Sequence, residues 1–174
     1  MKAVILNPGP SLANLDAVPE CDLSIAVNRA ALKFPCTIWA AADYPMIRDN
    51  WKQVLGQPRI LTIDQTWHDI GHRVALDLET TREEIFKTYL NTKDVNWPMC
   101  TSFMAVVCAA RAGATEIEIY GADWEGTEDF DGTQAAGEDR TEQRWEGERA
   151  TFIPLCEVLK KKGVEVRRIQ GVIA

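Results

Sequence analysis

Polar residues beside glycine and proline follow a short apolar segment near the start of the chain, and such residues can bind anions. The segment 3–6 is followed by Asn7-Pro8-Gly9-Pro10-Ser11. A strand that enters a tight glycine turn and then a helix leaves N–H groups at the positive end of the helix dipole. We therefore expect a phosphate or carboxylate at this turn, with Ser11 as the N-cap of a short helix to Leu15.

Two established phosphate-binding motifs are missing from this turn. The sequence contains no G-x-G-x-x-G after the first strand, and the turn carries no lysine as a P-loop requires. Without the dinucleotide fingerprint and its acidic partner, a nicotinamide-dependent dehydrogenase is a weak alternative. An ordinary strand-to-helix turn without a ligand is the other interpretation.

Similar polar residues follow other apolar segments or open helices further along the chain. In open parallel sheets, ligands bind outside the carboxyl ends of the strands, near the switch point in strand order. An alternative is that Asn28 and Asp43 only cap turns. The candidate site comprises Asn7, Gly9, Pro10, Ser11, Asn28, Asp43, Thr101, Ser102, Gly121 and Asp123.

Short apolar runs alternate with helix-like segments, which is typical of a parallel sheet covered on both faces. We predict strands at 3–6, 23–27, 37–41, 59–63, 116–120 and 164–169. We predict helical segments at 11–15, 30–34, 46–55, 81–90, 102–112 and 141–162. The expected fold is a three-layer, doubly wound α/β sheet in a single domain over 1–174. Apolar residues in the segment 64–98 follow no clear helical or strand periodicity, and we expect a lid or an insert there.

Composition limits the classes of partner. The chain has 174 residues, 46% of them hydrophobic, as expected of a soluble globular domain. Its net charge of -7 argues against nucleic acid as a partner, and no apolar run approaches the about 18 residues of a membrane span. The five cysteines show no C-x-x-C pair, and we expect most to be buried in a reduced, cytoplasmic protein. His68 and His72 have helical spacing, but Gly71 weakens a zinc site there.

The segment 125–139 is acidic and contains glycine, so we expect a surface loop, with disorder in the absence of a ligand as one option. Carboxylates are the ligands that Mg²⁺ prefers, and arginines can stabilise a transferring phosphoryl group. The candidates are Glu125, Glu128, Asp129, Asp131, Arg140, Arg144 and Arg149. Alternatively, the carboxylates are solvated and the arginines pair with Glu146 and Glu148 along one helix.

Taken together, the motifs resemble those of a known group of proteins. The segments N-P-G-P-S-L (7–12), A-V-N-R (26–29), T-S (101–102) and E-I-E-I-Y-G-A-D-W (116–124) are similar to family 42 sialyltransferases. Motility-accessory-factor proteins and archaeal-type 6-hydroxymethylpterin diphosphokinases share the G-P-S-L turn. The resemblance covers about 1–120 and 141–169, and it implies a Rossmann-like fold that binds a nucleotide or a nucleotide-sugar.

The resemblance also implies roles for individual residues. The turn 7–11 would lie against ribose and phosphate, and Asn28 would face the sugar or phosphate of the donor. Thr101 and Ser102 would hold the base, ribose or phosphate at the helix start. Asp123 would close the nucleotide pocket, and it is the candidate catalytic residue.

Two departures from the family pattern leave the reaction open. The sialyltransferases use a histidine after the G-x-D strand as general base and tyrosines on the departing phosphate, but here no His follows His72 and no Tyr follows Tyr120.

The leading hypothesis is a nucleotide-binding transferase, with Mg²⁺-dependent pyrophosphoryl transfer favoured over metal-free sialyl transfer. The alternative is a non-catalytic, phage-encoded protein for binding or assembly that keeps the fold. The sequence leaves a homo-oligomer open.

Overall fold

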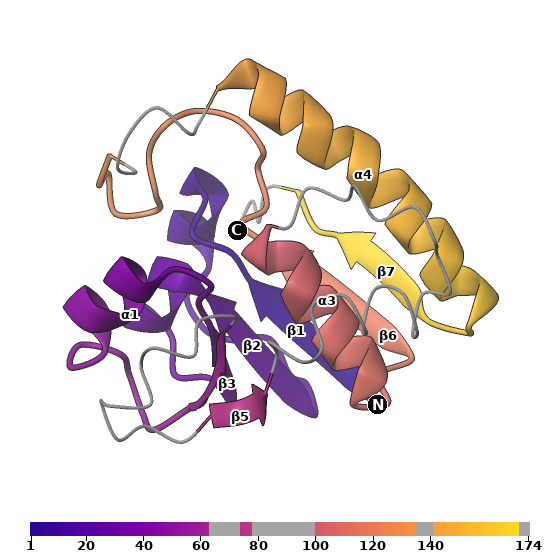
Figure 1. The fold of residues 1–174 in the computed structure, drawn as a ribbon, viewed down its shortest axis with the longest axis horizontal. Helices are drawn as coiled ribbons and strands as arrows, with labels where there is room; N and C mark the ends of the chain where they lie inside the picture. Colours follow the sequence, from indigo (N-terminus) through magenta and orange to yellow (C-terminus); the bar gives the residue numbers. More distant parts are fainter. Residues whose placement is uncertain (63–73, 78–99, 135–140, 171–174) are drawn as a thin grey trace.

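A computed structural model describes residues 1–62, 74–77, 100–134 and 141–170 (Figure 1). Within these ranges the chain forms one seven-stranded sheet of order β5-β4-β3-β2-β1-β6-β7. All neighbouring strands are parallel. The strands are β1 (Lys2–Leu6), β2 (Leu23–Val27), β3 (Ile38–Ala40), β4 (Arg59–Thr62), β5 (Val74–Asp77), β6 (Glu116–Tyr120) and β7 (Glu165–Arg168). The predicted α/β, Rossmann-like class is confirmed.

The strand order reverses beside β1. The chain moves outward from β1 through β2, β3 and β4 to β5, and it then returns to the other side of β1 at β6. The carboxyl ends of β1 and β6 therefore form the topological switch point, where open α/β sheets bind ligands.

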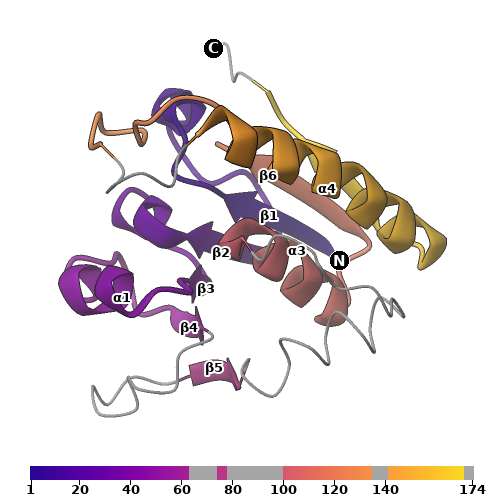
Figure 2. The ribbon, with the colours of Figure 1, turned by 45° about the horizontal axis from the view of Figure 1, so that its top comes forward.

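Alternate side chains of the central strands pack on opposite faces of the sheet. Ala3 and Ile5 join one buried cluster with α3 (Thr101–Arg111) and α4 (Glu142–Lys161). Val4 and Leu6 join a second cluster with the 3₁₀ helices η1 (Pro10–Asn14) and η2 (Asn28–Leu32) and with α1 (Tyr44–Asn50). Figure 2 shows α3 and α4 together over the β1–β6 part of the sheet, apart from α1. The central strands read as continuous apolar runs because both of their faces are buried.

The face of β6 and β7 opposite α4 is polar. Glu118 forms an ion pair with Lys2 at 2.9 Å and lies 3.4 Å from Arg167. Arg167 also pairs with Glu116. The alternating sequence Glu116-Ile117-Glu118-Ile119-Tyr120 is typical of a strand with one solvated face. Cover on both faces, as expected from the sequence, therefore does not extend to this end of the described sheet.

Several element boundaries differ from expectation. η1 and η2 are 3₁₀ rather than α-helical, as is common for such short pieces, and the N-cap of η1 is Gly9 rather than Ser11. α1 ends at Asn50 instead of Leu55. β5 was not predicted, whereas the predicted helix 81–90 and the pair His68 and His72 lie outside the described residues.

Burial of the cysteines is less complete than predicted. Cys100 and Cys108 are buried, whereas Cys21, Cys36 and Cys156 are half-buried, and all are free thiols. Burial raises the pKa of the Cys100 thiol to about 12 and that of the Cys108 thiol to about 11. Both thiols are therefore poor nucleophiles at neutral pH. In the described ranges, no helix has the length and apolarity needed to cross a bilayer.

Candidate functional site

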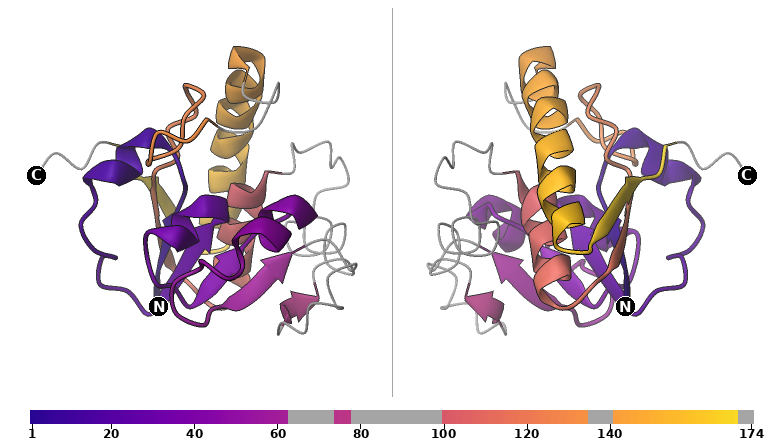
Figure 3. Two further views of the ribbon diagram at one scale, coloured as in Figure 1. Left: turned by 90° about the vertical axis from the view of Figure 1, so that its left-hand side faces the viewer. Right: turned by 90° about the vertical axis from the view of Figure 1, so that its right-hand side faces the viewer.

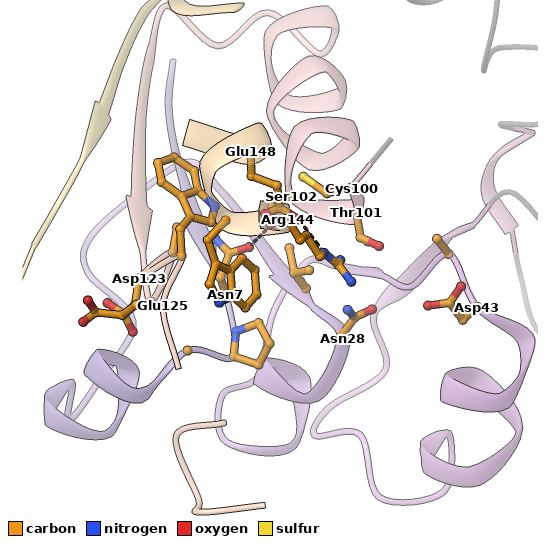
Figure 4. A pocket seen from close by; sticks show the side chains of 18 residues that line it. Asn7, Asn28, Asp43, Cys100, Thr101, Ser102, Asp123, Glu125, Arg144 and Glu148 are labelled. Atoms are coloured by element: carbon orange, nitrogen blue, oxygen red, sulfur yellow. Dashed lines mark hydrogen bonds and ion pairs between the residues drawn. The ribbon is translucent and has the colours of Figure 1, made fainter. Parts of the chain in front are cut away.

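A cavity of about 330 Å³ lies at the carboxyl ends of β1, β2, β3 and β6, beside the first turns of α3 and α4 (Figure 4). We call it the switch-point cavity. Its size is at the lower end of the about 300–1,000 Å³ typical of ligand sites. Of the predicted site residues, it is lined by Asn7, Gly9, Asn28, Asp43, Thr101, Ser102, Gly121 and Asp123. Pro10 and Ser11 are not among its lining residues.

Close backbone contact between the ends of β1 and β6 builds one wall of the cavity. The Asn7 N–H donates to the Tyr120 carbonyl at 2.8 Å, and the Gly9 N–H donates to the Gly121 carbonyl at 3.0 Å. A Cβ on Gly121 would come well within 3.0 Å of the Asn7 carbonyl oxygen, and a Cβ on Gly9 would lie 2.5 Å from Asp123 Oδ2. Both glycines are therefore required for this approach of two strand ends.

Asp123 stabilises the turn after β1 from within the protein. Its Oδ2 accepts a hydrogen bond from the Ser11 N–H at 2.8 Å. The N–H group at the start of η1, which the sequence suggested for a phosphate, is thus already satisfied by a carboxylate of the chain. Asp123 holds the turn in place and is one of the residues that line the cavity.

A hydrogen-bonded pair joins β1 to α3 at the centre of the site. The Ser102 hydroxyl donates to Asn7 Oδ1, and Asn7 Nδ2 donates to the Tyr120 carbonyl at 3.3 Å. Asn7 is only 3% exposed, so its orientation is fixed. The same pair fixes the Ser102 side chain at the first turn of α3, whose N-cap residue, Cys100, makes no side-chain capping bond. Because Cys100, Thr101 and Ser102 line the cavity, the positive end of the α3 dipole lies beside it.

Asn28 has an unusual backbone conformation and an unsatisfied side chain. Its φ of +49° lies in the left-handed region, and its carbonyl accepts a hydrogen bond from Trp39 Nε1 at 2.9 Å. Its Oδ1 is buried, and no residue of the described ranges donates to it. A buried acceptor without a partner costs about 1–3 kcal/mol. A donor on a bound molecule would remove that cost.

Two charged residues of α4 complete the cavity. Glu148 is 4% exposed, and its Oε1 accepts from Arg144 Nε at 2.9 Å. Pairing along one helix, the simpler interpretation of the sequence, is therefore correct for these two residues, but both also line the cavity (Figure 4). The spacing of Trp145, Glu148 and Phe152 places Glu148 on the buried face of α4, and this periodicity was the signal that sequence analysis missed.

The other predicted positions have more peripheral surroundings. Asp43 is exposed at the start of α1 and makes no side-chain capping bond. Trp124 and Trp145 are buried and line the cavity, as expected of pocket-wall residues. Arg149 pairs with Glu142 and donates to the Trp124 carbonyl at 2.8 Å, which anchors α4 to the end of β6.

Ion pairs with Arg29 hold the acidic loop after β6 against the strand ends. Arg29 lies 3.4 Å from Asp129 and 2.5 Å from Asp131, and it donates to Thr133 at 3.1 Å. The Phe130 N–H also donates to the Pro8 carbonyl at 2.8 Å. Asp129 is only 4% exposed, so it is not a solvated loop residue. The described part of this loop is therefore folded.

The ion pairs of Arg29 with Asp129 and Asp131 also affect the expected Mg²⁺ site. Asp129 and Asp131 do not line the cavity, and their carboxylates face a guanidinium. In the described ranges, no three acidic, histidine or cysteine side chains gather into a cluster that could hold a metal ion by themselves. Within the described ranges, the carboxylates of Asp129 and Asp131 are therefore engaged by Arg29 instead of being directed at the cavity, and binding of Mg²⁺ stays a prediction.

The ion pair between Arg29 and Asp131 makes the free energy of unfolding sensitive to acid pH. Burial would raise the pKa of Asp131, but hydrogen bonds from Arg29 and Thr133 lower it from 3.8 to about 2. A carboxyl group with a depressed folded-state pKa adds stability above its unfolded pKa and loses it as pH falls through the folded value. We expect Asp131→Asn to flatten the dependence of the free energy of unfolding on pH between about 4 and about 2. Denaturant titrations across that range test this, and an unchanged slope would contradict it.

Comparison with known proteins gives a match at the level of structure. The sequence matches no protein-family model and no curated protein at a significant level. Among solved structures, the fold is similar to that of the sialyltransferase CST-II in complex with a trisaccharide acceptor and CMP. The TM-score is 0.56 at 12% identity, and the alignment covers 100% of this chain and 84% of that one. The chain therefore has a glycosyltransferase-like, Rossmann-like α/β fold.

Proposed function

We propose that this chain is a nucleotide-dependent transferase that binds a nucleotide-sugar in the switch-point cavity and transfers the sugar to an acceptor hydroxyl. The observation that carries the proposal is the polar cavity at the switch point of a fold similar to a sialyltransferase. That neighbour holds CMP, which supports a nucleotide as the ligand here. Pyrophosphoryl transfer from a nucleoside triphosphate with Mg²⁺ is the alternative reaction, in which substrate phosphates and one or two carboxylates would hold the ion.

Three groups would bind the donor. The first turn of α3, with Thr101 and Ser102, would take a phosphate, since its N–H groups lie at the positive end of the helix dipole. Asn28 would accept a hydrogen bond from the donor through its unsatisfied Oδ1. Gly9 and Gly121 would shape this site, because the absence of a Cβ at both positions lets the ends of β1 and β6 approach each other.

The sialyltransferases use a histidine as general base, and this chain has no His after His72. Our candidate for the general base here is Glu148. It is a buried carboxylate in the cavity wall, close to the start of α3. In the proposed step, Glu148 takes the proton of the acceptor hydroxyl, and the acceptor oxygen forms a bond to the anomeric carbon of the sugar. The bond from that carbon to the phosphate oxygen breaks, and the nucleotide leaves with the electron pair.

Ligand-induced stabilisation tests nucleotide binding. We expect CMP, CDP, CTP or UDP to raise the melting temperature of the full chain, since a ligand at a hundredfold excess over Kd stabilises the native state by about 2.7 kcal/mol. Asn28→Gly should weaken binding about ten- to a hundredfold, the effect of losing one buried hydrogen bond. Ser102→Ala should also weaken binding, because it removes the hydrogen bond that orients Asn7 beside the first turn of α3. Glycine suits position 28 because of its positive φ.

Ser24→Ala is the matched control, because Ser24 bonds to Thr37 near the amino end of β2 and does not line the cavity. It should leave nucleotide binding unchanged. No shift with any nucleotide, including GDP and ATP with and without Mg²⁺, would reject the proposal. A shift without turnover would instead favour a non-catalytic binding protein. Cytoplasmic location and phage origin stay predictions.

A further inference from the structure

The sheet ends at β7 with an edge that no described strand or helix pairs with. The Glu165 N–H donates to the Thr115 carbonyl and the Ile169 N–H donates to the Ile119 carbonyl, both toward β6. Since backbone groups of a strand alternate in direction, the N–H and C=O of Val166 point away from β6. Val166 is therefore the centre of a free hydrogen-bonding edge. Figure 3, right, faces this edge, with α4 beside it.

The side chains along this edge are self-complementary. Glu165 and Arg167 flank Val166 and point to the polar face of the sheet, where Arg167 meets Glu116 and Glu118. If two β7 strands pair antiparallel about a two-fold axis through Val166, each Glu165 lies opposite Arg167 of the second copy. Opposite charges at such positions stabilise a strand pair, and like charges destabilise it. The backbone agrees with this register, because Val166 would exchange both of its outward hydrogen bonds with its counterpart.

A groove continues the same edge on the other face of the sheet. This cavity of about 760 Å³ between α4 and β7 is lined by the apolar residues Phe152, Ile153, Cys156, Val164 and Val166 and by the charged residues Glu157, Lys160 and Glu165, among others. Ile153 is 63% exposed, an unusual exposure for so large an apolar side chain. Two-fold pairing of β7 brings the α4 helices of both copies to the same face, where each Ile153 can enter the groove region of the other copy. We call the edge and this groove the β7 surface.

We propose that two copies of this chain form a two-fold symmetric dimer through the β7 surface, which joins the two sheets into one continuous sheet. Three features favour a second copy as the occupant. Glu165 would lie opposite Arg167 of the other copy, the N–H and C=O of Val166 point away from β6, and Ile153 is exposed. An isologous contact of this kind closes the assembly at two chains. Pairing also covers an edge that would otherwise be open to unspecific strand addition.

Sedimentation velocity over a concentration series tests the dimer. We expect the mass of the full chain to rise from 19.5 kDa to twice that value as concentration increases. Glu165→Arg should weaken dimerisation by about tenfold or more, because two like-charge contacts replace two ion pairs. It should leave the monomer folded, because position 165 lies beside Glu116 on β6.

Glu146→Arg is the matched control, since Glu146 is exposed on α4 and is not part of the β7 surface. It makes the same change in charge and should leave the dimer intact. Ile153→Glu, at an exposed position that the fold does not need, should also weaken the dimer. A wild-type chain that stays at 19.5 kDa at every concentration would overturn the proposal. A dimer that survives both Glu165→Arg and Ile153→Glu would do the same, because its interface would then lie elsewhere.

Discussion

Gly121→Ala is expected to destabilise the fold by about 3 kcal/mol or more, or to prevent folding. Gly121 has a φ of +67°, and a Cβ there would collide with the Asn7 carbonyl oxygen and with the Leu12 side chain. A left-handed conformation costs a residue with a side chain about 1–2 kcal/mol, and the clash with rigid backbone adds to this. Because the collision lies between the ends of β1 and β6, relief of the clash would also open the switch-point cavity.

Equilibrium unfolding in denaturant measures this effect, and Gly147→Ala is the control. Gly147 lies inside α4, and a Cβ at that position would meet no heavy atom within 4 Å. Alanine is favoured over glycine in a helix by about 0.5–1 kcal/mol, so this variant should be slightly more stable than the wild type. Equal denaturation midpoints for the two variants would show that the strand-end contact is not what constrains position 121.

Glu148→Gln is expected to reduce turnover by about 10²–10⁴-fold, the usual contribution of a general base. Glutamine keeps the size of the side chain and can still accept the hydrogen bond from Arg144, but it cannot take a proton. The variant should therefore retain the thermal shift caused by a nucleotide. Product formation from a nucleotide-sugar and an acceptor is the measurement, with nucleotide binding checked on the same preparation.

Glu142→Gln is the matched control for this prediction. Glu142 lies on the same helix and pairs with Arg149, but its side chain is 67% exposed and does not line the cavity. It should keep wild-type turnover. If Glu148→Gln also keeps it, Glu148 is not the base, and Asp123 becomes the next carboxylate of the cavity to substitute. Asp123 is harder to interpret, since its loss would also release the Ser11 N–H.

Local pattern was sufficient to predict most elements of this fold. The runs 23–27 and 116–120 are strands with the predicted bounds, because short β-branched and apolar runs between turn residues have few other stable conformations. Parallel order followed from the alternation of strands with helices. It also explains why residues as distant as Asn7 and Ser102 meet, since the carboxyl ends of parallel strands share one edge. Whether these residues bind a nucleotide stays a prediction.

Other features depended on partners that are far away in sequence. The acidic residues of 125–134 looked like metal ligands or solvated charges, but Asp131 pairs with Arg29, 102 positions away. Asp123 was predicted to bind a ligand, which stays a prediction, and the structure adds its hydrogen bond from the Ser11 N–H, 112 positions away. A side chain pattern cannot show which of several opposite charges or free N–H groups will lie nearby.

The sequence by itself therefore determined the class of the fold and the edge of the sheet at which polar residues collect. Both depend on the periodicity of apolar residues and on the order of strands and helices along the chain. Only the tertiary structure decided which polar groups remain available for a ligand. Asn28 Oδ1 remains unsatisfied, and Glu148 is buried in the cavity wall, whereas the carboxylates of Asp129 and Asp131 are neutralised by Arg29. The physical reason is that hydrogen bonds and ion pairs form between groups that are close in space, and packing alone sets that distance.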